Sequence, residues 1–325
     1  MKSYTFIKLS LSFILFEVSI ILAYAFYYNL FYLTPIPITN HISFDAKLKF
    51  VREHIDPDKI DTIVLGSSIG LNNILTEELI KNSKNIKYAV NMSVYESSTL
   101  QVEQLLELIE AFPNLKRVIY SVQYSDTPSG RKFKNYQPQK LVRYMRHELN
   151  IFEYLILLLE SCNNMQFCYE RRKTWVHKHE QKNKFTSLVF DKGGSVPLYI
   201  YGKDVIQSRW NHPHPGVIAN ASIIAIGRMA DKLFHKNTKF YIVHQPYRKG
   251  LYDKYKEVRG AIAYFDKRVE QILQNKKNAF LIKTQHLGLH GNKYFADRTH
   301  LNVDGSKAVS KYVAKQIDTL ESKHE

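Results

Sequence analysis

The sequence predicts an α/β protein with a mostly parallel sheet of about five strands between helical layers, as in a three-layer sandwich, preceded by one transmembrane helix. Short apolar runs typical of strands alternate along the chain with longer stretches typical of helices. This alternation indicates a parallel sheet with helices on both faces. A separate apolar stretch occupies residues 9–33. The 325 residues, 45% of them hydrophobic, can bury one large core or two modest ones.

The N-terminal stretch at residues 9–33 is almost wholly apolar and aromatic. About 25 residues, each rising about 1.5 Å in a helix, can cross a hydrocarbon core of about 30 Å with some tilt. Lys2 and Lys8 precede the stretch, which predicts a cytoplasmic N-terminus and an exported body. A cleaved signal peptide is the alternative, because Ala23-Tyr24-Ala25 matches a small-x-small cleavage pattern. The apolar run continues well past that point, which favours an uncleaved anchor.

Three segments are expected: a membrane anchor at residues 1–34, a linker with a short helix at 35–57, and an α/β domain at 58–325. Apolar runs predict strands at residues 62–65, 88–91, 117–122, 239–244 and 279–282. Helix-type stretches lie at residues 46–54, 76–81, 99–111, 217–234, 252–274 and 305–320. Ligands of such sheets bind at the carboxyl ends of the strands, so the loops that follow the strands are the expected site.

An insertion at about residues 125–215 interrupts the alternation of strands and helices. It contains an apolar helical segment at residues 150–159 and a glycine-containing turn at residues 191–195. A lid over the site, a partner-binding surface and a stabilising excursion of the chain all fit this composition.

Two short segments carry the chemistry. Residues 61–68 form a buried-strand pattern that ends in Gly66-Ser67-Ser68 and runs into a helix, and residues 297–302 place Asp297 three positions before His300. Together they supply a serine nucleophile, a general base and a carboxylate that can orient the base within one tight turn, which is the equipment for acyl transfer through a covalent ester. The alternative for Gly-Ser-Ser is a helix cap, in which a serine hydroxyl accepts a hydrogen bond from the first helical turn.

These motifs, strand–Gly-Ser-Ser–helix near the start and Asp-x-x-His–helix near the end, resemble the SGNH (GDSL-like) hydrolase superfamily, whose sheet is flavodoxin-like. The closer resemblance is to its membrane-anchored bacterial branch, which handles acyl groups on envelope polymers and includes relatives of D-alanyl transfer and alginate acetylation proteins. It covers about residues 58–125 and 217–320. By position it implies Ser68 as nucleophile, His300 as base and Asp297 as orienting acid, with Ser67 as the fallback nucleophile.

The chain departs from the family pattern at the oxyanion hole. The family has a glycine after the second strand and an asparagine after the third, whereas Ser93 and Gln123 stand near these places here. We expect the backbone N–H groups of Ser68 and Ser93 to bind the oxyanion, with the Gln123 amide as a further donor. His244, at the end of the fourth strand, is expected to line the substrate pocket.

The formal net charge of +16 raises the possibility of nucleic-acid binding. No nucleic-acid fold signature accompanies the charge, and an exported body lies in the wrong compartment, so we exclude that class. A basic surface toward anionic lipid headgroups or an anionic glycan fits better, and a solvated basic surface without a specific partner is the plain alternative. Cys162 and Cys168 are compatible with a local disulfide or with two packed thiols. His212 and His214 lack nearby acidic residues, and no metal site is expected.

The resemblance implies a membrane-anchored serine acyltransferase or esterase on the extracytoplasmic face of the cytoplasmic membrane. Its expected substrates are O-acyl groups, acetyl above all, of a cell-envelope polysaccharide or related glycan, and the chemistry needs neither a metal nor an organic cofactor. The alternative function is a catalytically inactive scaffold that partners a multispanning membrane acyltransferase. The missing asparagine and the ionisable Glu17 within the apolar stretch motivate it.

Overall fold

The computed structural model describes residues 2–127, 132–134, 136–161, 164–181, 185–206 and 218–323. Five strands form one all-parallel sheet in the order β2-β1-β3-β4-β5, one of the common orders of doubly wound sheets. The strands are β1 (Thr62–Gly66), β2 (Ala89–Asn91), β3 (Arg117–Val122), β4 (Lys239–His244) and β5 (Ala279–Lys283). All five predicted strands are confirmed. The chain reverses direction across the sheet between β1 and β3, which is where doubly wound sheets bind ligands.

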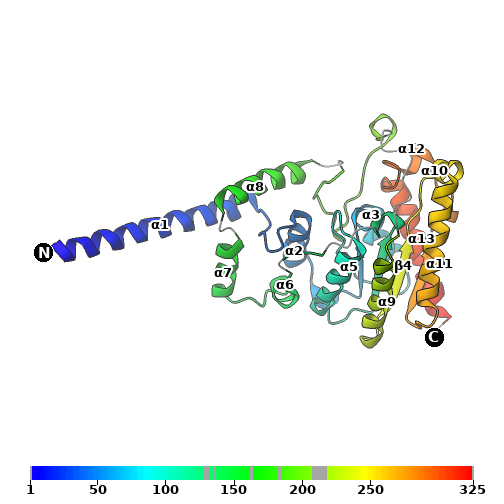
Figure 1. Ribbon diagram of the computed structural model, residues 1–325, viewed down its shortest axis with the longest axis horizontal. Helices are drawn as coiled ribbons and strands as arrows, with labels where there is room; N and C mark the ends of the chain where they lie inside the picture. Colours follow the sequence, from blue (N-terminus) through cyan, green and yellow to red (C-terminus); the bar gives the residue numbers. More distant parts are fainter. Residues whose placement is uncertain are drawn as a thin grey trace.

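Helices cover both faces of the sheet (Figure 1). One face packs against α5, α9 and α11, and the other against α4 and α13. The helices of the α/β body are α2 (Ile42–His54), α3 (Ser68–Asn73), α4 (Thr76–Asn82), α5 (Thr99–Leu105), α9 (Asn220–His235), α10 (Lys249–Lys254), α11 (Lys256–Leu273), α12 (Gly291–Tyr294) and α13 (Val303–Ser322). Short 3₁₀ turns are η1 (Pro57–Lys59), η2 (Leu106–Ala111), η3 (Tyr124–Asp126), η4 (Gly202–Asp204) and η6 (Gln285–Leu287).

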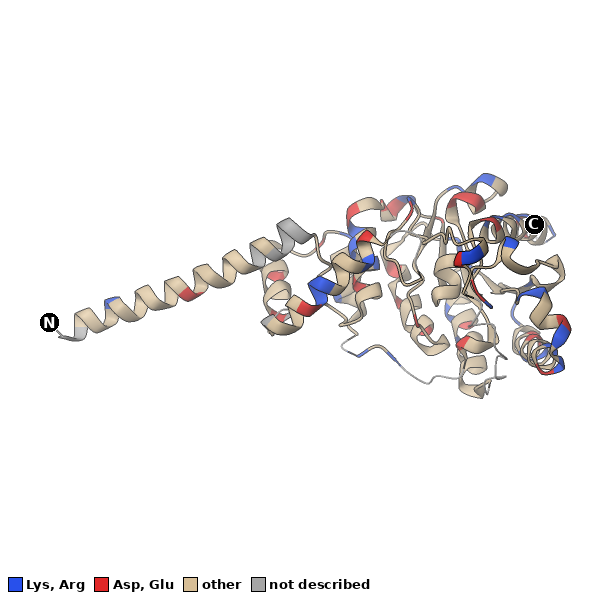
Figure 2. Cartoon of the chain, turned by 90° about the horizontal axis from the view of Figure 1, so that it is seen from above, with Lys and Arg blue, Asp and Glu red and all other residues tan. Residues whose placement is uncertain are grey.

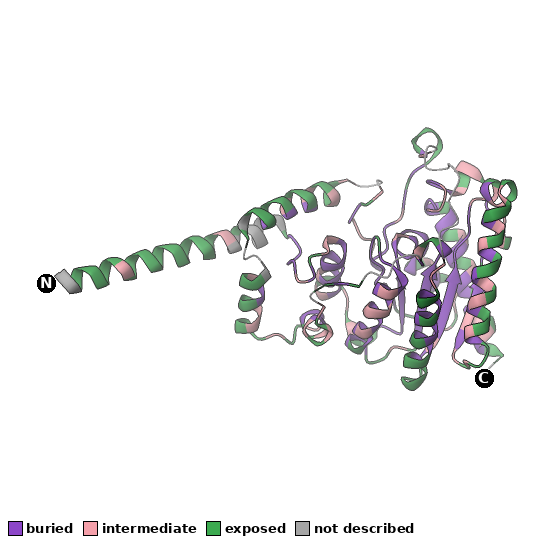
Figure 3. Cartoon of the chain, in the orientation of Figure 1, coloured by how far each residue is buried: buried purple, intermediate pink, exposed green. Residues whose placement is uncertain are grey.

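The strands are apolar along nearly their whole length because both of their faces are buried. Successive residues of β1 point to opposite sides, so Ile63 and Leu65 belong to one core cluster and Val64 belongs to the other. Figure 3 shows the sheet as the most continuously buried part of the chain. A sequence that alternated polar and apolar residues would have left one face exposed to water.

The N-terminal helix α1 (Lys2–Tyr32) projects from the body as a single rod (Figure 1). Its residues Tyr4–Tyr24 are, by length and composition, the only stretch among the described residues that could cross a membrane. These 21 residues span about 31 Å, close to the thickness of a hydrocarbon core. The predicted apolar stretch at residues 9–33 therefore starts later than the helix does. Figure 2 shows α1 almost without charge, apart from isolated residues, whereas charges of both signs cover the body.

The insertion forms α6 (Pro138–Met145), α7 (Ile151–Ser161) and α8 (Met165–Glu180), which lie between α1 and the sheet (Figure 1). Its later part is bound to the body by backbone hydrogen bonds, from Asn91 N–H to the Gly193 carbonyl (2.8 Å) and from Val196 N–H to the Leu71 carbonyl (3.0 Å). The buried Lys47 of α2 donates to the carbonyl of Gly194. The segment around residues 193–196 is therefore tied to β2, α2 and α3 of the body.

A buried ion pair joins the start of β3 to the end of α13. The Arg117 guanidinium donates to both carboxylate oxygens of Glu321 (2.8 and 2.7 Å), and the Tyr241 hydroxyl donates to the same carboxylate (2.8 Å). We expect Glu321→Ala to lower the free energy of unfolding by about 3–5 kcal/mol, because it leaves the Arg117 charge buried. Among the described residues, Asp61, 3.9 Å from the guanidinium, would then remain as its ion-pair partner.

Urea titration of the full chain in detergent measures this loss. Glu110 provides the matched control, since its carboxylate pairs with Lys236 at the surface (3.2 Å, both side chains about half exposed). Glu110→Ala should change the free energy of unfolding by less than about 1 kcal/mol. Equal losses in the two variants would mean that the buried pair does not stabilise the fold.

Candidate active site

The turn from β1 into α3 positions the two candidate serines. The strand ends at Gly66, Ser67 is the N-cap of α3, and Ser68 is the first helical residue. A Cβ atom at Gly66 would come within 2.5 Å of the Ser121 carbonyl oxygen and 3.1 Å of the Gly70 Cα atom. Only glycine allows β1 to pass so close to both β3 and α3, and this close passage sets where the serines emerge.

Ser68, His300 and Asp297 form one hydrogen-bonded row, a triad. The Ser68 Oγ atom lies 2.9 Å from His300 Nε2, and His300 Nδ1 lies 2.9 Å from Asp297 Oδ2. The serine and the histidine are 232 positions apart in the chain. Because the carboxylate accepts the proton on Nδ1, the neutral imidazole has its free lone pair on Nε2, where it accepts the Ser68 hydroxyl. This is the arrangement that activates a serine for nucleophilic attack.

The loop that carries Asp297 and His300 is closed by its own hydrogen bonds. Asp297 Oδ1 accepts the backbone N–H groups of Thr299 (2.8 Å) and His300 (2.7 Å), while Ala296 N–H donates to the His300 carbonyl (2.9 Å). The two carboxylate oxygens therefore have separate tasks: Oδ1 shapes the turn, and Oδ2 holds the imidazole. Asn302 is the N-cap of the following helix, α13, and its side-chain oxygen accepts the Gly305 N–H (3.1 Å).

Asp297 is ionised over the whole range in which enzymes work. Burial would raise the pKa of this carboxyl, but the charge of His300 and the hydrogen bonds from His300 and the Thr299 N–H outweigh burial and lower the pKa to about 2. The side chain is 2% exposed. A buried, permanently charged carboxylate is what is needed to stabilise an imidazolium that forms during proton transfer.

Ser67 has a different role from Ser68. Its Oγ atom accepts the Ile69 N–H (3.2 Å) as a helix cap and donates its own proton to Asp126 Oδ1 (2.9 Å). The cap and the nucleophile, which the sequence left as alternatives for Gly-Ser-Ser, thus fall on different serines. As the fallback nucleophile, Ser67 has the Asp126 carboxylate and not a histidine as its hydrogen-bond acceptor.

Asp126 is the residue that sequence reasoning missed. It follows β3, its Oδ2 atom accepts the Gln123 N–H (2.9 Å), and its Oδ1 atom accepts the Ser67 hydroxyl. Burial raises its pKa to about 6, against the lowering effect of these hydrogen bonds and of the nearby His300 and His244. The sequence did contain one signal for Asp126: it follows the carboxyl end of the third strand, at the edge of the sheet where the site was expected.

The predicted oxyanion donors at Ser93 and Gln123 are engaged elsewhere. The Ser93 N–H donates to the side-chain oxygen of Asn91 (3.0 Å), and the Gln123 amide nitrogen donates to the Pro246 carbonyl (3.1 Å). Both residues are fully buried. In this structure both groups have other hydrogen-bond partners, and their role as oxyanion donors stays a prediction. The Ser68 N–H has no acceptor among the described residues and remains the predicted donor.

His244 lies at the carboxyl end of β4, in register with Val122 of β3. It is 3% exposed, its Nδ1 atom is 2.6 Å from Asp266 Oδ1, and its ring packs on Phe265 with centroids 4.6 Å apart. Its location at the edge of the sheet was predicted correctly. Its side chain, however, belongs to the interior, and the structure does not place it on an accessible pocket wall.

The insertion contributes an aromatic ring to the site. Phe185, in the segment after α8, lies edge-on to the His300 imidazole, with ring centroids 5.7 Å apart and an interplanar angle of 71°. No pattern in the sequence connects this residue to His300, because the contact depends on how the insertion folds back over the sheet edge. Part of the insertion therefore borders the site, which is one of the roles considered for it.

No group of three or more potential metal ligands occurs among the described residues. His212 and His214 lie outside them. Cys168 is disulfide-bonded, and Cys162, the other cysteine, also lies outside the described residues.

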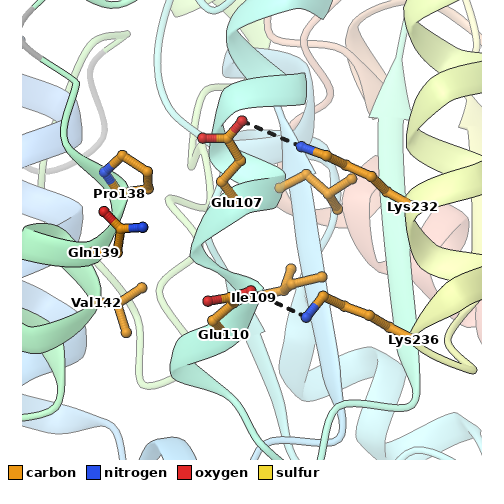
Figure 4. A pocket seen from close by; sticks show the side chains of 9 residues that line it. Glu107, Ile109, Glu110, Pro138, Gln139, Val142, Lys232 and Lys236 are labelled. Atoms are coloured by element: carbon orange, nitrogen blue, oxygen red, sulfur yellow. Dashed lines mark hydrogen bonds and ion pairs between the residues drawn. The ribbon is translucent and has the colours of Figure 1, made fainter.

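A pocket of about 240 Å³ lies between η2, α6 and α9, away from the triad (Figure 4). Its charged residues pair with one another, Glu107 with Lys232 (3.3 Å) and Glu110 with Lys236 (3.2 Å). The pocket is lined by residues from η2, which precedes β3, whereas Ser68 lies at the carboxyl edge of the sheet. It therefore adds nothing to the triad.

Comparison with known proteins yields no family model and no curated protein that matches this chain.

Proposed function

We propose that this protein is a membrane-anchored serine esterase or O-acyltransferase of the SGNH type, with the three-layer fold of that superfamily. The observation that carries the proposal is the row Ser68–His300–Asp297, with successive distances of 2.9 and 2.9 Å. The row lies at the carboxyl edge of a doubly wound sheet, beside the reversal between β1 and β3. A serine cap alone would require neither the histidine nor the carboxylate behind it.

In the first half-reaction, Ser68 Oγ attacks the acyl carbon while His300 Nε2 takes the hydroxyl proton. The carbonyl oxygen becomes an oxyanion, which the Ser68 N–H stabilises. The tetrahedral intermediate then expels the alcohol of the donor, which receives the proton from His300. In the second half-reaction, His300 deprotonates water or a sugar hydroxyl, that oxygen attacks the ester, and Ser68 recovers its proton. Asp297 remains a carboxylate throughout.

The substrate class follows from the setting of the site. The apolar helix α1 and the two lysines near its N-terminus favour an exported body held at the cytoplasmic membrane. The net charge of +16 favours an anionic or phosphate-rich polymer as the surrounding, because such a polymer attracts a basic protein and would repel an acidic one. We infer that the acyl group, acetyl in the simplest case, is moved on or off a cell-envelope glycan.

The second candidate function is a catalytically inactive scaffold for a multispanning acyltransferase. The engaged donors at Ser93 and Gln123 favour it, because they leave the oxyanion with fewer donors than a serine hydrolase normally offers. Glu17 within α1 would then contact the partner in the membrane.

Labelling with a fluorophosphonate followed by peptide mass spectrometry distinguishes the two functions. For an enzyme, we expect a single adduct on Ser68 in the full chain, retained in Ser67→Ala and lost in His300→Ala, because only a serine with a base reacts. Absence of an adduct under conditions that label a control esterase would favour the scaffold. An adduct on Ser67 would move the nucleophile by one residue and would require a different base.

A further inference from the structure

Helix α7 (Ile151–Ser161) has apolar residues on two faces, yet only one of these faces is buried. Tyr154, Leu157 and Leu158 face the body and pack on its core. The opposite face is exposed and consists of Ile151, Phe152, Leu155, Ile156 and Leu159, each between 40% and 74% exposed. In a soluble protein such a face is polar, and a contiguous exposed apolar face marks a contact surface.

Contacts with α2 and α6 set the orientation of the exposed face. Arg143 of α6 forms a bidentate ion pair with Glu153 (2.8 and 2.7 Å). The guanidinium of Arg52 lies 4.9 Å from the ring centre of Tyr144 and 5.2 Å from that of Tyr154. These contacts join α7 to α2 and α6, on the side of α7 away from its exposed apolar face.

The position of α7 relative to α1 identifies what covers this face. Figure 1 shows α7 at the edge of the body from which α1 projects, level with the C-terminal end of α1 and running across its direction. Figure 3 shows the same edge as exposed. Helix α8 lies beside the end of α1, with the Arg172 guanidinium 5.8 Å from the ring centre of Tyr27.

The depth of this edge can be estimated from α1. The far end of the apolar stretch is rich in tyrosine, at Tyr24, Tyr27, Tyr28 and Tyr32, and tyrosine rings favour the interface between hydrocarbon and headgroups. Arg172 is therefore at the depth of the lipid headgroups, and the exposed Lys173 follows it on α8. Cations at this depth suit anionic headgroups.

We propose that α7 is a second membrane contact: an interfacial helix that lies in the plane of the bilayer and buries its outer apolar face at the boundary between headgroups and acyl chains. The occupant of the surface is lipid, because the face runs parallel to the expected membrane plane and meets it at headgroup depth. Together, α1 and α7 fix the tilt of the body and the height of the triad above the bilayer. The inference rests on α1 as the anchor, and it is independent of the chemistry of Ser68.

The test uses the full chain reconstituted in two sets of vesicles, one of phosphatidylcholine brominated near the headgroup end of its acyl chains and one of phosphatidylcholine brominated near the methyl end. Three single substitutions are compared with the unsubstituted chain: Phe152→Trp on α7, Phe16→Trp on α1, and Phe234→Trp on α9, which is 56% exposed and distant from α1 in Figure 1. Each exchanges one exposed aromatic for another, so the fold is not disturbed. We expect the tryptophan emission added at position 152 to fall about twofold or more with the headgroup-end label, as for a side chain at the boundary between headgroups and acyl chains. The emission added at position 16 should fall about twofold or more with the methyl-end label, as for a side chain in the middle of the span.

Emission added at position 234 should not change. Quenching at position 16 with none at position 152 would overturn the inference while leaving the anchor in place. No quenching at position 16 would overturn the anchor and this inference with it. A photoreactive benzoylphenylalanine at position 156, in native membranes, separates lipid from protein: an adduct with lipid supports the inference, and an adduct with a second polypeptide overturns it.

Discussion

Ser68→Ala is expected to abolish turnover of an activated acetyl ester, lowering kcat by about 10⁴-fold or more, because no other described hydroxyl lies beside His300 Nε2. The change removes one oxygen atom and leaves the cap of α3, which is Ser67, in place. The measurement is hydrolysis of 4-nitrophenyl acetate by the full chain in detergent, with transfer to a sugar hydroxyl as a second readout. Retained turnover would rule out Ser68 as the nucleophile.

Ser67→Ala is the matched control, since it removes the same atom from the neighbouring residue. It loses the cap on Ile69 and the hydrogen bond to Asp126, so we expect a stability loss of about 1 kcal/mol. Its kcat should remain within about tenfold of the unsubstituted value, because Ser68 and its base are unchanged. A loss in Ser67→Ala as large as that in Ser68→Ala would show that the cap, and not the nucleophile, controls the rate.

The strands and the order of the site motifs were predictable because they depend on local pattern. A buried parallel strand needs a continuous apolar run, as in residues 62–65, and such a run is visible without any knowledge of its neighbours. The same holds for Asp297 and His300, whose three-residue spacing already places both side chains in one turn. Their meeting with Ser68 followed from the rule that loops after parallel strands share one edge.

The oxyanion donors were not predictable in the same way. An N–H group serves an oxyanion only if no nearer acceptor takes it. The competing acceptors here are the Asn91 side chain for the Ser93 backbone N–H and the Pro246 carbonyl for the Gln123 side-chain amide. Neither competitor has a sequence signal. Asp126 and Phe185 were missed for a related reason, because their contacts with Ser67 and His300 arise from tertiary packing across distant segments.

Asp297→Asn is expected to lower kcat by about 10³–10⁴-fold while leaving the loop intact. The asparagine oxygen can still accept the N–H groups of Thr299 and His300, which Oδ1 accepts in the native chain. The amide nitrogen, however, replaces Oδ2 beside His300 Nδ1 and donates a proton to it. The imidazole then carries its own proton on Nε2, the atom that must accept the Ser68 proton, so the base is held in the wrong tautomer.

The pH dependence of stability provides a second readout that a general loss of structure would not produce. The pKa of Asp297 is about 2 in the folded chain, below the ordinary value of 3.8. A carboxyl with a lowered pKa stabilises the fold above its ordinary pKa, and this contribution disappears as the pH falls through the folded value. The unsubstituted chain should therefore lose about 2 kcal/mol more unfolding free energy between pH 4 and pH 2 than Asp297→Asn does.

Kinetics at neutral pH and urea titrations at several acidic pH values together check this prediction. The expected result is a large loss of kcat, an unchanged circular dichroism spectrum and a smaller loss of unfolding free energy between pH 4 and pH 2. This result would show that Asp297 sets the tautomer of His300 and is the negative charge beside it. A variant that retains kcat within about tenfold would contradict the tautomer argument, because a triad without its carboxylate loses far more. The serine would then be activated by His300 alone, and the short contact between Asp297 and His300 would serve only to shape the turn that leads into α13.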